Sequence, residues 1–159
     1  MKILVFSDSH SRSNKILEVL KLHNGKCDAV VFCGDGARDM DYIKSKYPDI
    51  PFFIVKGNCD YFSGDYSDEL FVSFGEIKVM IAHGHKHGVK SSLTALLMDA
   101  KLNGADAVFF GHTHIPYDNI HDVGDKRIHL FNPGSIGASS TYGVINTSGK
   151  VLVTSIAKI

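Results

Sequence analysis

Short apolar segments that end in polar, ligand-type residues recur five times in this chain. In an open α/β sheet, ligands bind beyond the carboxyl ends of the strands, so side chains that follow several strands converge in space. This repetition places the strongest constraint on the fold, because it predicts several strands whose carboxyl ends share one edge. The five segments are VFSDSH (5–10), VFCGDG (31–36), IVKGNCD (54–60), VMIAHGH (79–85) and VFFGHTH (108–114).

The first half of the chain alternates strand and helix patterns. Apolar runs predict strands at 2–6, 28–33 and 51–56, and amphipathic patterns predict helices at 13–23 and 39–47. Ser13 is a plausible N-cap for the first helix, and Pro48 ends the second. A βαβαβ order of this kind predicts parallel strands joined by right-handed crossovers.

The pattern changes after residue 70. Two strands around Gly75 predict a hairpin over 70–84, and an amphipathic helix over 90–104 ends at a glycine C-cap. Strands are predicted at 106–111 and 127–135, and a second hairpin turns at TSGK within 142–157. The whole chain, 1–159, therefore predicts one α/β domain with a mixed sheet, or two packed sheets, flanked by helices.

Composition excludes several classes of protein. Seventeen basic and seventeen acidic residues give a formal net charge of zero, so the chain lacks the basic patch typical of nucleic-acid binding. Three cysteines argue against a disulfide framework, and no run approaches the ~20 apolar residues of a membrane segment. We therefore expect a cytoplasmic protein. The apolar region 61–71 suggests a lid or a contact surface, which allows a homo-oligomer such as a dimer.

Nine histidines are more than twice the roughly 2% expected of a globular chain. Taken singly, Asp8, Asp35 or Asn58 is more typical of a helix cap or turn than of a ligand, but the fivefold repetition favours a shared site. Carboxylate, imidazole and amide oxygen suit Zn, Mn, Fe or Mg. The candidate ligands are Asp8, His10, Asp35, Asn58, His83, His112 and His114.

Seven ligands are too many for one ion, whereas two ions that share a carboxylate would use them well. Two metals ~3.5–4 Å apart can clamp the attacking and leaving oxygens of an in-line displacement. Phosphate ester hydrolysis is the natural reaction of such a site.

The segments DSH, GDG, GNCD, HGH and GHTH, followed by NPGS (132–135), resemble in their order the signature of the calcineurin-like metallophosphoesterases. The short length is similar to the small single-domain prokaryotic phosphodiesterase subgroup, which also contains the retromer scaffold subunit. The resemblance implies a four-layer αββα sandwich of two mixed β-sheets flanked by helices.

The resemblance also implies roles for individual residues. Two divalent ions would be bound, Mn²⁺ being the expected metal and Ni²⁺, Fe²⁺ or Zn²⁺ the alternatives, with a water or hydroxide between them as nucleophile. The first ion would be held by Asp8, His10, Asp35 and His114, and the second by Asp35, Asn58, His83 and His112. Catalytic roles would fall to Asp35, Asn58 and Asp60, and substrate contacts to Asn58 and His83. The positions of His85, Arg12 and Arg38 beside these segments make His85 a further catalytic candidate and the two arginines candidate phosphate contacts, with plain solvent exposure as the equal alternative for each.

Cys59 departs from the pattern of the larger relatives, which carry histidine at this position as a general acid or phosphate ligand. A thiol with a pKa of about 8.5 is a poor substitute for an imidazole donor. We expect Cys59 to be a half-buried residue that packs beside Asn58, and the leaving group to be protonated by water or His85, or to need little protonation. Asn132 and Ser135 are expected to support the site loops.

Other residues of these types are expected to have no part in catalysis. They are His23, His87, His121 and His129, together with the packing residues Cys27 and Cys33. The predicted function is a dinuclear metal-dependent phosphoesterase that acts on a small-molecule or nucleotide phosphoester, with a phosphodiesterase favoured. A catalytically inactive protein-binding scaffold of the same fold, or a phosphomonoesterase, is the alternative.

Overall fold

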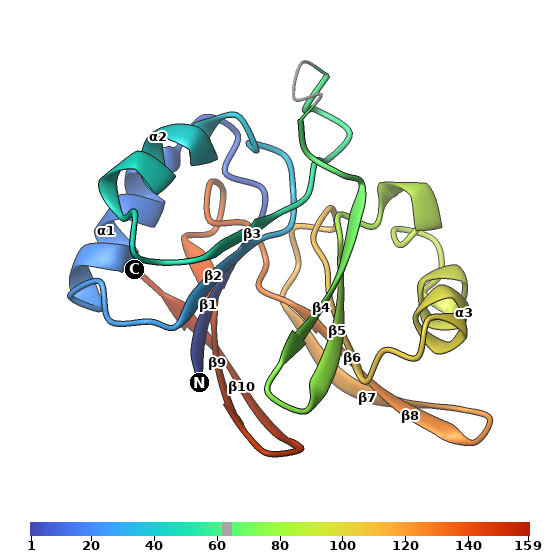
Figure 1. Cartoon of the computed structure of the whole chain (residues 1–159). Helices are drawn as coiled ribbons and strands as arrows, with labels where there is room; N and C mark the ends of the chain where they lie inside the picture. Colours follow the sequence, from blue (N-terminus) through green and yellow to red (C-terminus); the bar gives the residue numbers. More distant parts are fainter. Residues whose placement is uncertain (62–64) are drawn as a thin grey trace.

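Two five-stranded sheets pack face to face in the computed structural model, which describes residues 1–61 and 65–159 (Figure 1). Part of the region 61–71, the expected lid or contact surface, lies outside the described residues. The first sheet has the order β10-β9-β1-β2-β3, and the second has the order β4-β5-β6-β8-β7. Both sheets are mixed, as the sequence predicts.

The strands of the first sheet are β1 (Lys2–Phe6), β2 (Ala29–Phe32), β3 (Phe52–Ile54), β9 (Thr141–Ser148) and β10 (Val151–Lys158). Those of the second sheet are β4 (Glu69–Phe74), β5 (Ile77–Ala82), β6 (Ala107–Phe109), β7 (Tyr117–Val123) and β8 (Lys126–Asn132). The helices are α1 (Ser13–Leu22), α2 (Asp39–Lys46), α3 (Thr94–Leu102) and the short 3₁₀ helix η1 (His85–His87).

Three apolar clusters hold the four layers together. Ile3 and Val5 of β1 meet Val79 and Phe109 of the second sheet between the two sheets. The outer face of the first sheet is covered by α1 and α2, and that of the second sheet by α3 (Figure 1). The predicted αββα sandwich is therefore confirmed.

Parallel pairing sets the place of the functional residues. In the first sheet β1 pairs with β2 and β2 with β3 in parallel, and in the second sheet β5 pairs with β6 and β6 with β8 in parallel. Carboxyl ends of parallel strands lie at the same edge, so the loops after β1, β2, β3, β5 and β6 gather at one end of the sandwich. The described part of the chain contains no helix that is both long and apolar enough to cross a membrane.

Three local predictions are wrong. Ser13 is the first helical residue rather than the N-cap, because Arg12 takes that place without a side-chain cap. The third helix begins at Thr94 and not at residue 90, since 85–93 form η1 and a turn. Strand β7 was not predicted. It lies at a sheet edge, and its side chains are exposed or half-buried, so it shows no continuous apolar run.

Candidate metal centre

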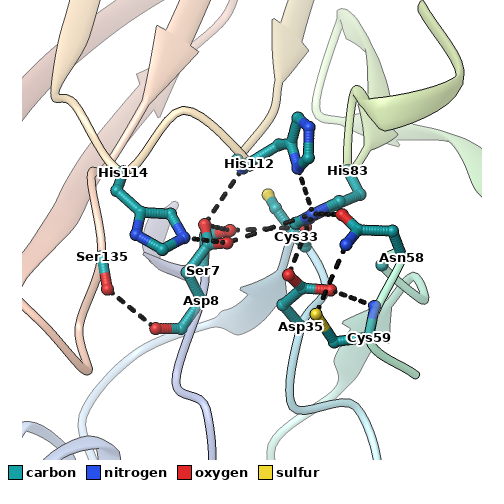
Figure 2. Close-up of polar contacts among 12 residues, drawn as sticks. Ser7, Asp8, Cys33, Asp35, Asn58, Cys59, His83, His112, His114 and Ser135 are labelled. Atoms are coloured by element: carbon teal, nitrogen blue, oxygen red, sulfur yellow. Dashed lines mark hydrogen bonds and ion pairs between the residues drawn. The ribbon is translucent and has the colours of Figure 1, made fainter. Parts of the chain in front are cut away.

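All seven predicted ligands converge at the carboxyl end of the strands. Figure 2 labels each of them except His10. They arrive on loops from both sheets, so the site lies where the two sheets meet. Asp8 and His10 follow β1, Asp35 follows β2, Asn58 follows β3, His83 follows β5, and His112 and His114 follow β6.

One side of the site is the His114 group, formed by Asp8, His10 and His114. The Nε2 atom of His114 lies 3.1 Å from Asp8 Oδ1 and 3.3 Å from Nε2 of His10. The Nε2 atom of His10 lies 3.9 Å from the same Asp8 oxygen. Three ligand atoms thus face a common point.

The other side is the His83 group, formed by Asn58, His83 and His112. The Nε2 atom of His83 lies 3.2 Å from Asn58 Oδ1 and 3.2 Å from Nδ1 of His112. Its Nδ1 atom lies 2.6 Å from the carbonyl oxygen of Cys33. That carbonyl can only accept a hydrogen bond, so Nδ1 carries a proton, and Nε2 is the nitrogen that would bind an ion.

Asp35 stands between the two groups. Its Oδ2 atom lies 3.5 Å from Nε2 of His83 and 3.9 Å from Nε2 of His10. Its Oδ1 atom accepts a hydrogen bond of 2.8 Å from the backbone N–H of Cys59. One oxygen is therefore fixed to the backbone, while the other faces both groups.

The residues fit a bound cation. Asp8 Oδ1 is buried and has no hydrogen-bond partner among the described residues, although Oδ2 accepts bonds from Ser7 Oγ and the N–H of His112. Unpartnered buried oxygens are costly. This oxygen faces imidazole Nε2 atoms at 3.1, 3.9 and 4.0 Å, an arrangement that a divalent ion would satisfy.

Backbone strain marks the same residues. Non-glycine residues rarely adopt positive φ, and strained conformations gather at functional sites. Five of the seven candidate ligands have positive φ, namely Asp8 (56°), His10 (43°), Asp35 (60°), His112 (67°) and His114 (61°). Local sequence preference does not favour these turns, so the surrounding packing imposes them.

The electrostatics of the site favour a positive charge. Burial raises the pKa of Asp8, although His83 and Ser7 oppose the shift. Burial acts in the same direction on Asp35, but hydrogen bonding and charge attraction to His83 hold its pKa well below the usual range. Burial opposes protonation of His83, and the nearby Asp35 and Asp8 outweigh it and raise the pKa of His83. The carboxylates that attract a proton here would also attract a metal ion.

His112 differs from His83. Burial and the positive charge of His83 lower the pKa of His112 to about 4. Its imidazole is therefore neutral near pH 7, which is the form that binds a metal.

Asp60 fastens the loops that carry the ligands. Its two carboxylate oxygens accept hydrogen bonds from four backbone N–H groups, those of Asp35, Gly36, Ala37 and Gly57, at 2.8, 2.9, 3.0 and 2.8 Å. Gly57 is required beside it, because a Cβ there would meet the carboxylate of Asp35. The geometry assigns Asp60 to positioning, while a direct catalytic part stays a prediction.

Cys59 lies beside the ligands, with Sγ 3.3 Å from Nδ2 of Asn58. This agrees with the expected neighbour, but the side chain is exposed rather than half-buried. A candidate metal-binding group also combines Cys59 with His10 and Asp35, all ligand atoms lying within 4.8 Å of one another. Burial and the charge of Asp35 raise the pKa of Cys59 to about 11, so the thiol is protonated at neutral pH.

Of the remaining predicted residues, His85 and Arg38 lie beside the centre, and Arg12 contacts a neighbouring loop. His85 lies near the His83 group, its ring centroid 5.3 Å from that of His83 and 6.1 Å from that of His112. Arg38 lines a cavity with His10 and Asp35. Arg12 instead donates a hydrogen bond of 2.7 Å to the carbonyl oxygen of Gly137, and so braces a neighbouring loop. A phosphate contact by Arg12 stays a prediction.

Support from the FNPGS segment is confirmed. Asn132 donates to the carbonyl of Gly111 at 2.8 Å, and Ser135 Oγ donates to the carbonyl of Asp8 at 2.9 Å. Sequence reasoning missed Ser7, whose hydroxyl donates to Asp8 at 2.5 Å, and the Cys33 carbonyl that orients His83. No signal in the sequence separates Ser7 from an ordinary strand-end serine.

The histidines expected to lack a catalytic part contact residues outside the centre. His23 meets Tyr142, His121 meets Tyr117, and His129 pairs with Asp118. A cavity of about 490 Å³ at the opposite end of the sandwich, between Glu76, Arg127 and Lys150, contains none of the predicted ligands.

Comparison with protein families adds a decisive match. Residues 1–152 match the model of the calcineurin-like phosphoesterase superfamily domain. The chain belongs to this superfamily. A probable metallophosphoesterase of Bacillus subtilis, YsnB, is 36% identical over 137 residues, which cover 86% of this chain and 75% of YsnB.

Solved structures agree with this superfamily fold. A conserved uncharacterized protein of Streptococcus pneumoniae, described as a predicted phosphoesterase, is 27% identical with a TM-score of 0.82 over 99% of this chain and 88% of its own. Vacuolar Protein Sorting 29 of Cryptosporidium parvum has a TM-score of 0.77 at 17% identity (99% and 91% covered). A novel archaeal phosphodiesterase has a TM-score of 0.70 at 23% identity (99% and 100% covered).

Membership of the superfamily supports a metal-dependent phosphoester hydrolase. The candidate metal-binding groups found in the structure include Asp8–His10–His114, which is the His114 group, and Asp35–His83–His112, which joins Asp35 to two members of the His83 group. The family and the geometry therefore point to the same end of the molecule.

Proposed function

We propose that this protein is a dinuclear metal-dependent phosphodiesterase. The observation that carries the proposal is the place of Asp35 Oδ2, which faces Nε2 of His83 at 3.5 Å and Nε2 of His10 at 3.9 Å. A carboxylate so placed can bridge an ion in each group. The mixed nitrogen and oxygen ligands suit Mn²⁺, with Ni²⁺, Fe²⁺ and Zn²⁺ as alternatives.

When bound, two such ions supply a water-derived nucleophile at neutral pH and compensate the charge of the phosphate oxygens. The residues of the chain do the rest. Asp35 and Asp8 provide the negative charge of the centre, while the neutral imidazole of His112 and the lone pair of His83 Nε2 complete the ligand set. Asp60 holds the Asp35 and Asn58 loops at a fixed spacing.

Two cavities beside the centre support a diester substrate. One, of about 330 Å³, is lined by His10 and Arg38, and the other, of about 490 Å³, is lined by Asn58, His85 and Lys86. A phosphodiester carries two organic groups on one phosphorus, and each cavity offers a place for one of them. The guanidinium of Arg38 suits an anionic small-molecule or nucleotide substrate, whereas Lys86 is paired with Asp68 at 2.7 Å.

The scaffold alternative has support from the fold alone, since the likeness to Vacuolar Protein Sorting 29 is at 17% identity. All seven ligand-type side chains are present and oriented toward common points, which favours the enzyme. A cytoplasmic location belongs to the same proposal and is supported by three cysteines that are all free thiols.

The test compares hydrolysis of bis(4-nitrophenyl) phosphate with that of 4-nitrophenyl phosphate. The protein is stripped with a chelator and reloaded with Mn²⁺, Ni²⁺, Fe²⁺ or Zn²⁺. We expect metal-dependent turnover with preference for the diester. If none of the four metals gives turnover, the proposal that the protein is an enzyme is wrong. Preference for the monoester would indicate a phosphomonoesterase.

Ligand variants test the dinuclear arrangement. We expect Asp35→Ala to lose both ions and at least ~10³-fold in kcat/KM, because several kcal/mol of charge stabilisation are removed. Asn58→Ala should lose mainly the ion of the His83 group. Asn119→Ala, an exposed change on β7, is the matched control. Elemental analysis gives the number of ions, and two ions in both site variants would contradict the bridging role of Asp35.

A further inference from the structure

Three ligand-type side chains gather outside the candidate metal centre. Glu69 begins β4, His87 ends η1, and Asp99 lies in α3, so three separate elements meet here. The Nε2 atom of His87 lies 3.0 Å from Asp99 Oδ2 and 3.4 Å from Glu69 Oε1. We call these three residues the outer cluster. None of them was predicted to bind a metal.

The ring of His87 is held with Nε2 toward both carboxylates. Its side chain is only 10% exposed, and its buried Nδ1 has no hydrogen-bond partner among the described residues. The contacts of Nε2 with Glu69 and Asp99 therefore set the orientation of the His87 ring. Asp99 is also fixed, because its Oδ1 accepts a hydrogen bond of 2.9 Å from Nδ2 of Asn103 one helical turn later.

Hydrogen bonding alone does not satisfy this arrangement. A single Nε2–H can donate well to one carboxylate, yet two carboxylates approach it, with exposures of 29% for Glu69 and 31% for Asp99. Within the described ranges 1–61 and 65–159, neither carboxylate forms an ion pair with a lysine or arginine. The outer cluster stays negative even when His87 is protonated, and partly buried negative charge favours a bound cation.

The spacing approaches that of a metal site, with the 3.4 Å contact of His87 with Glu69 inside the range below and the 3.0 Å contact with Asp99, a hydrogen-bond length, slightly short of it. Ligand atoms 2.0–2.2 Å from a tetrahedral zinc ion lie about 3.3–3.6 Å apart. The outer cluster shows 3.0 and 3.4 Å, and the candidate metal centre shows 3.1 Å between Asp8 and His114 and 3.5 Å between Asp35 and His83. The distances between ligand atoms in the outer cluster are thus as short as those in the candidate metal centre.

We propose that Glu69, His87 and Asp99 form a separate structural site for one divalent transition-metal ion. One imidazole and two carboxylates, with water in the fourth position, suit Zn²⁺. The ion would tie β4 and α3 to η1. Because His85 and Lys86 of η1 line the cavity beside Asn58, the site would also fix one wall of the substrate region.

The first measurement is the zinc content after equilibrium dialysis. We expect His87→Gln and Glu69→Gln each to hold one ion fewer per chain than the wild type. His129→Gln is the matched control, since His129 Nε2 pairs with a single carboxylate, Asp118 Oδ1 at 2.6 Å, and should not change the count. A wild-type ion count in folded His87→Gln and Glu69→Gln would overturn the proposal and leave a hydrogen-bonded triad.

A second measurement separates the outer cluster from the centre. The Asp8→Ala/Asp35→Ala double variant removes the two carboxylates of the centre, and we expect it to keep one zinc ion that is lost when His87→Gln is added. No zinc in the folded double variant would overturn the proposal. If circular dichroism shows that the double variant is unfolded, the single variants decide the question.

Discussion

The two groups of the candidate metal centre are built differently although they share Asp35. In the His114 group, the side chains of His10 and His114 are 39% and 40% exposed, and their rings contact each other and Asp8. In the His83 group, the His83 side chain is fully buried and anchored on a backbone carbonyl. The central imidazole of the His83 group is therefore part of the core, whereas both imidazoles of the His114 group are open to solvent.

The difference bears on preorganisation. A ligand fixed by packing and by a hydrogen bond needs little rearrangement when it binds a metal, whereas an exposed imidazole must be ordered. The His83 group should therefore hold its ion more firmly, and the His114 group should exchange its ion more readily. Three changes would break or sharpen this comparison.

The largest expected effect is on stability without metal. His83→Ala leaves a cavity and removes the donor to the Cys33 carbonyl, so we expect a loss of about 2–4 kcal/mol in the free energy of unfolding. His114→Ala should cost less than about 1 kcal/mol, because the side chain is partly exposed. Urea unfolding of chelator-treated protein measures both values. Equal losses in the free energy of unfolding would mean that burial of His83 contributes no more to stability than the partly exposed His114.

An intermediate effect is expected at Asp60. Asp60→Asn replaces an acceptor of four backbone N–H groups by an amide with only one acceptor oxygen, which loosens the Asp35 and Asn58 loops. Metal affinity should fall by about 10–100-fold, chiefly at the His83 group. Competition with a chelating dye measures it. Asp49→Asn, an exposed turn residue, is the control, and unchanged affinity in Asp60→Asn would remove the positioning role.

The smallest effect is expected at Cys59, which lies between the two groups. Its pKa of about 11 keeps the thiol protonated at pH 7 but makes it a weak acid. Cys59→Ala should change kcat by no more than about threefold, and Cys59→His should speed poor leaving groups by about tenfold through general acid catalysis. Rates on aryl phosphodiesters of graded leaving-group pKa measure this. A selective loss in Cys59→Ala on poor leaving groups would give the thiol a part in the mechanism.

Much of the fold could be predicted from the chain alone. Strands β1, β2 and β5 are short runs of apolar residues because they are buried on both faces, and such runs are visible in a sequence. Strand β7 could not be found in this way, since an edge strand with exposed side chains shows weak periodicity. The helix boundary near residue 90 was missed because the chain turns after Gly88, which adopts a φ of 63°, and the helix begins only at Thr94.

The candidate site likewise has features that the sequence predicts and features that it does not. The seven ligand-type residues follow strand ends in the sequence, so their convergence could be predicted. The brace formed by Asp60, the contact of Arg12 with Gly137 and the exposure of Cys59 could not, because each depends on how separate loops approach one another.

The sequence by itself determined which side chains meet at the candidate metal centre, because these residues follow strand ends that share one edge. Only the tertiary structure decided which of them are buried, which face of each imidazole is free, and that Glu69, His87 and Asp99 come together. Burial and ring orientation arise from contacts between residues far apart in the chain. The local sequence pattern does not predict those contacts.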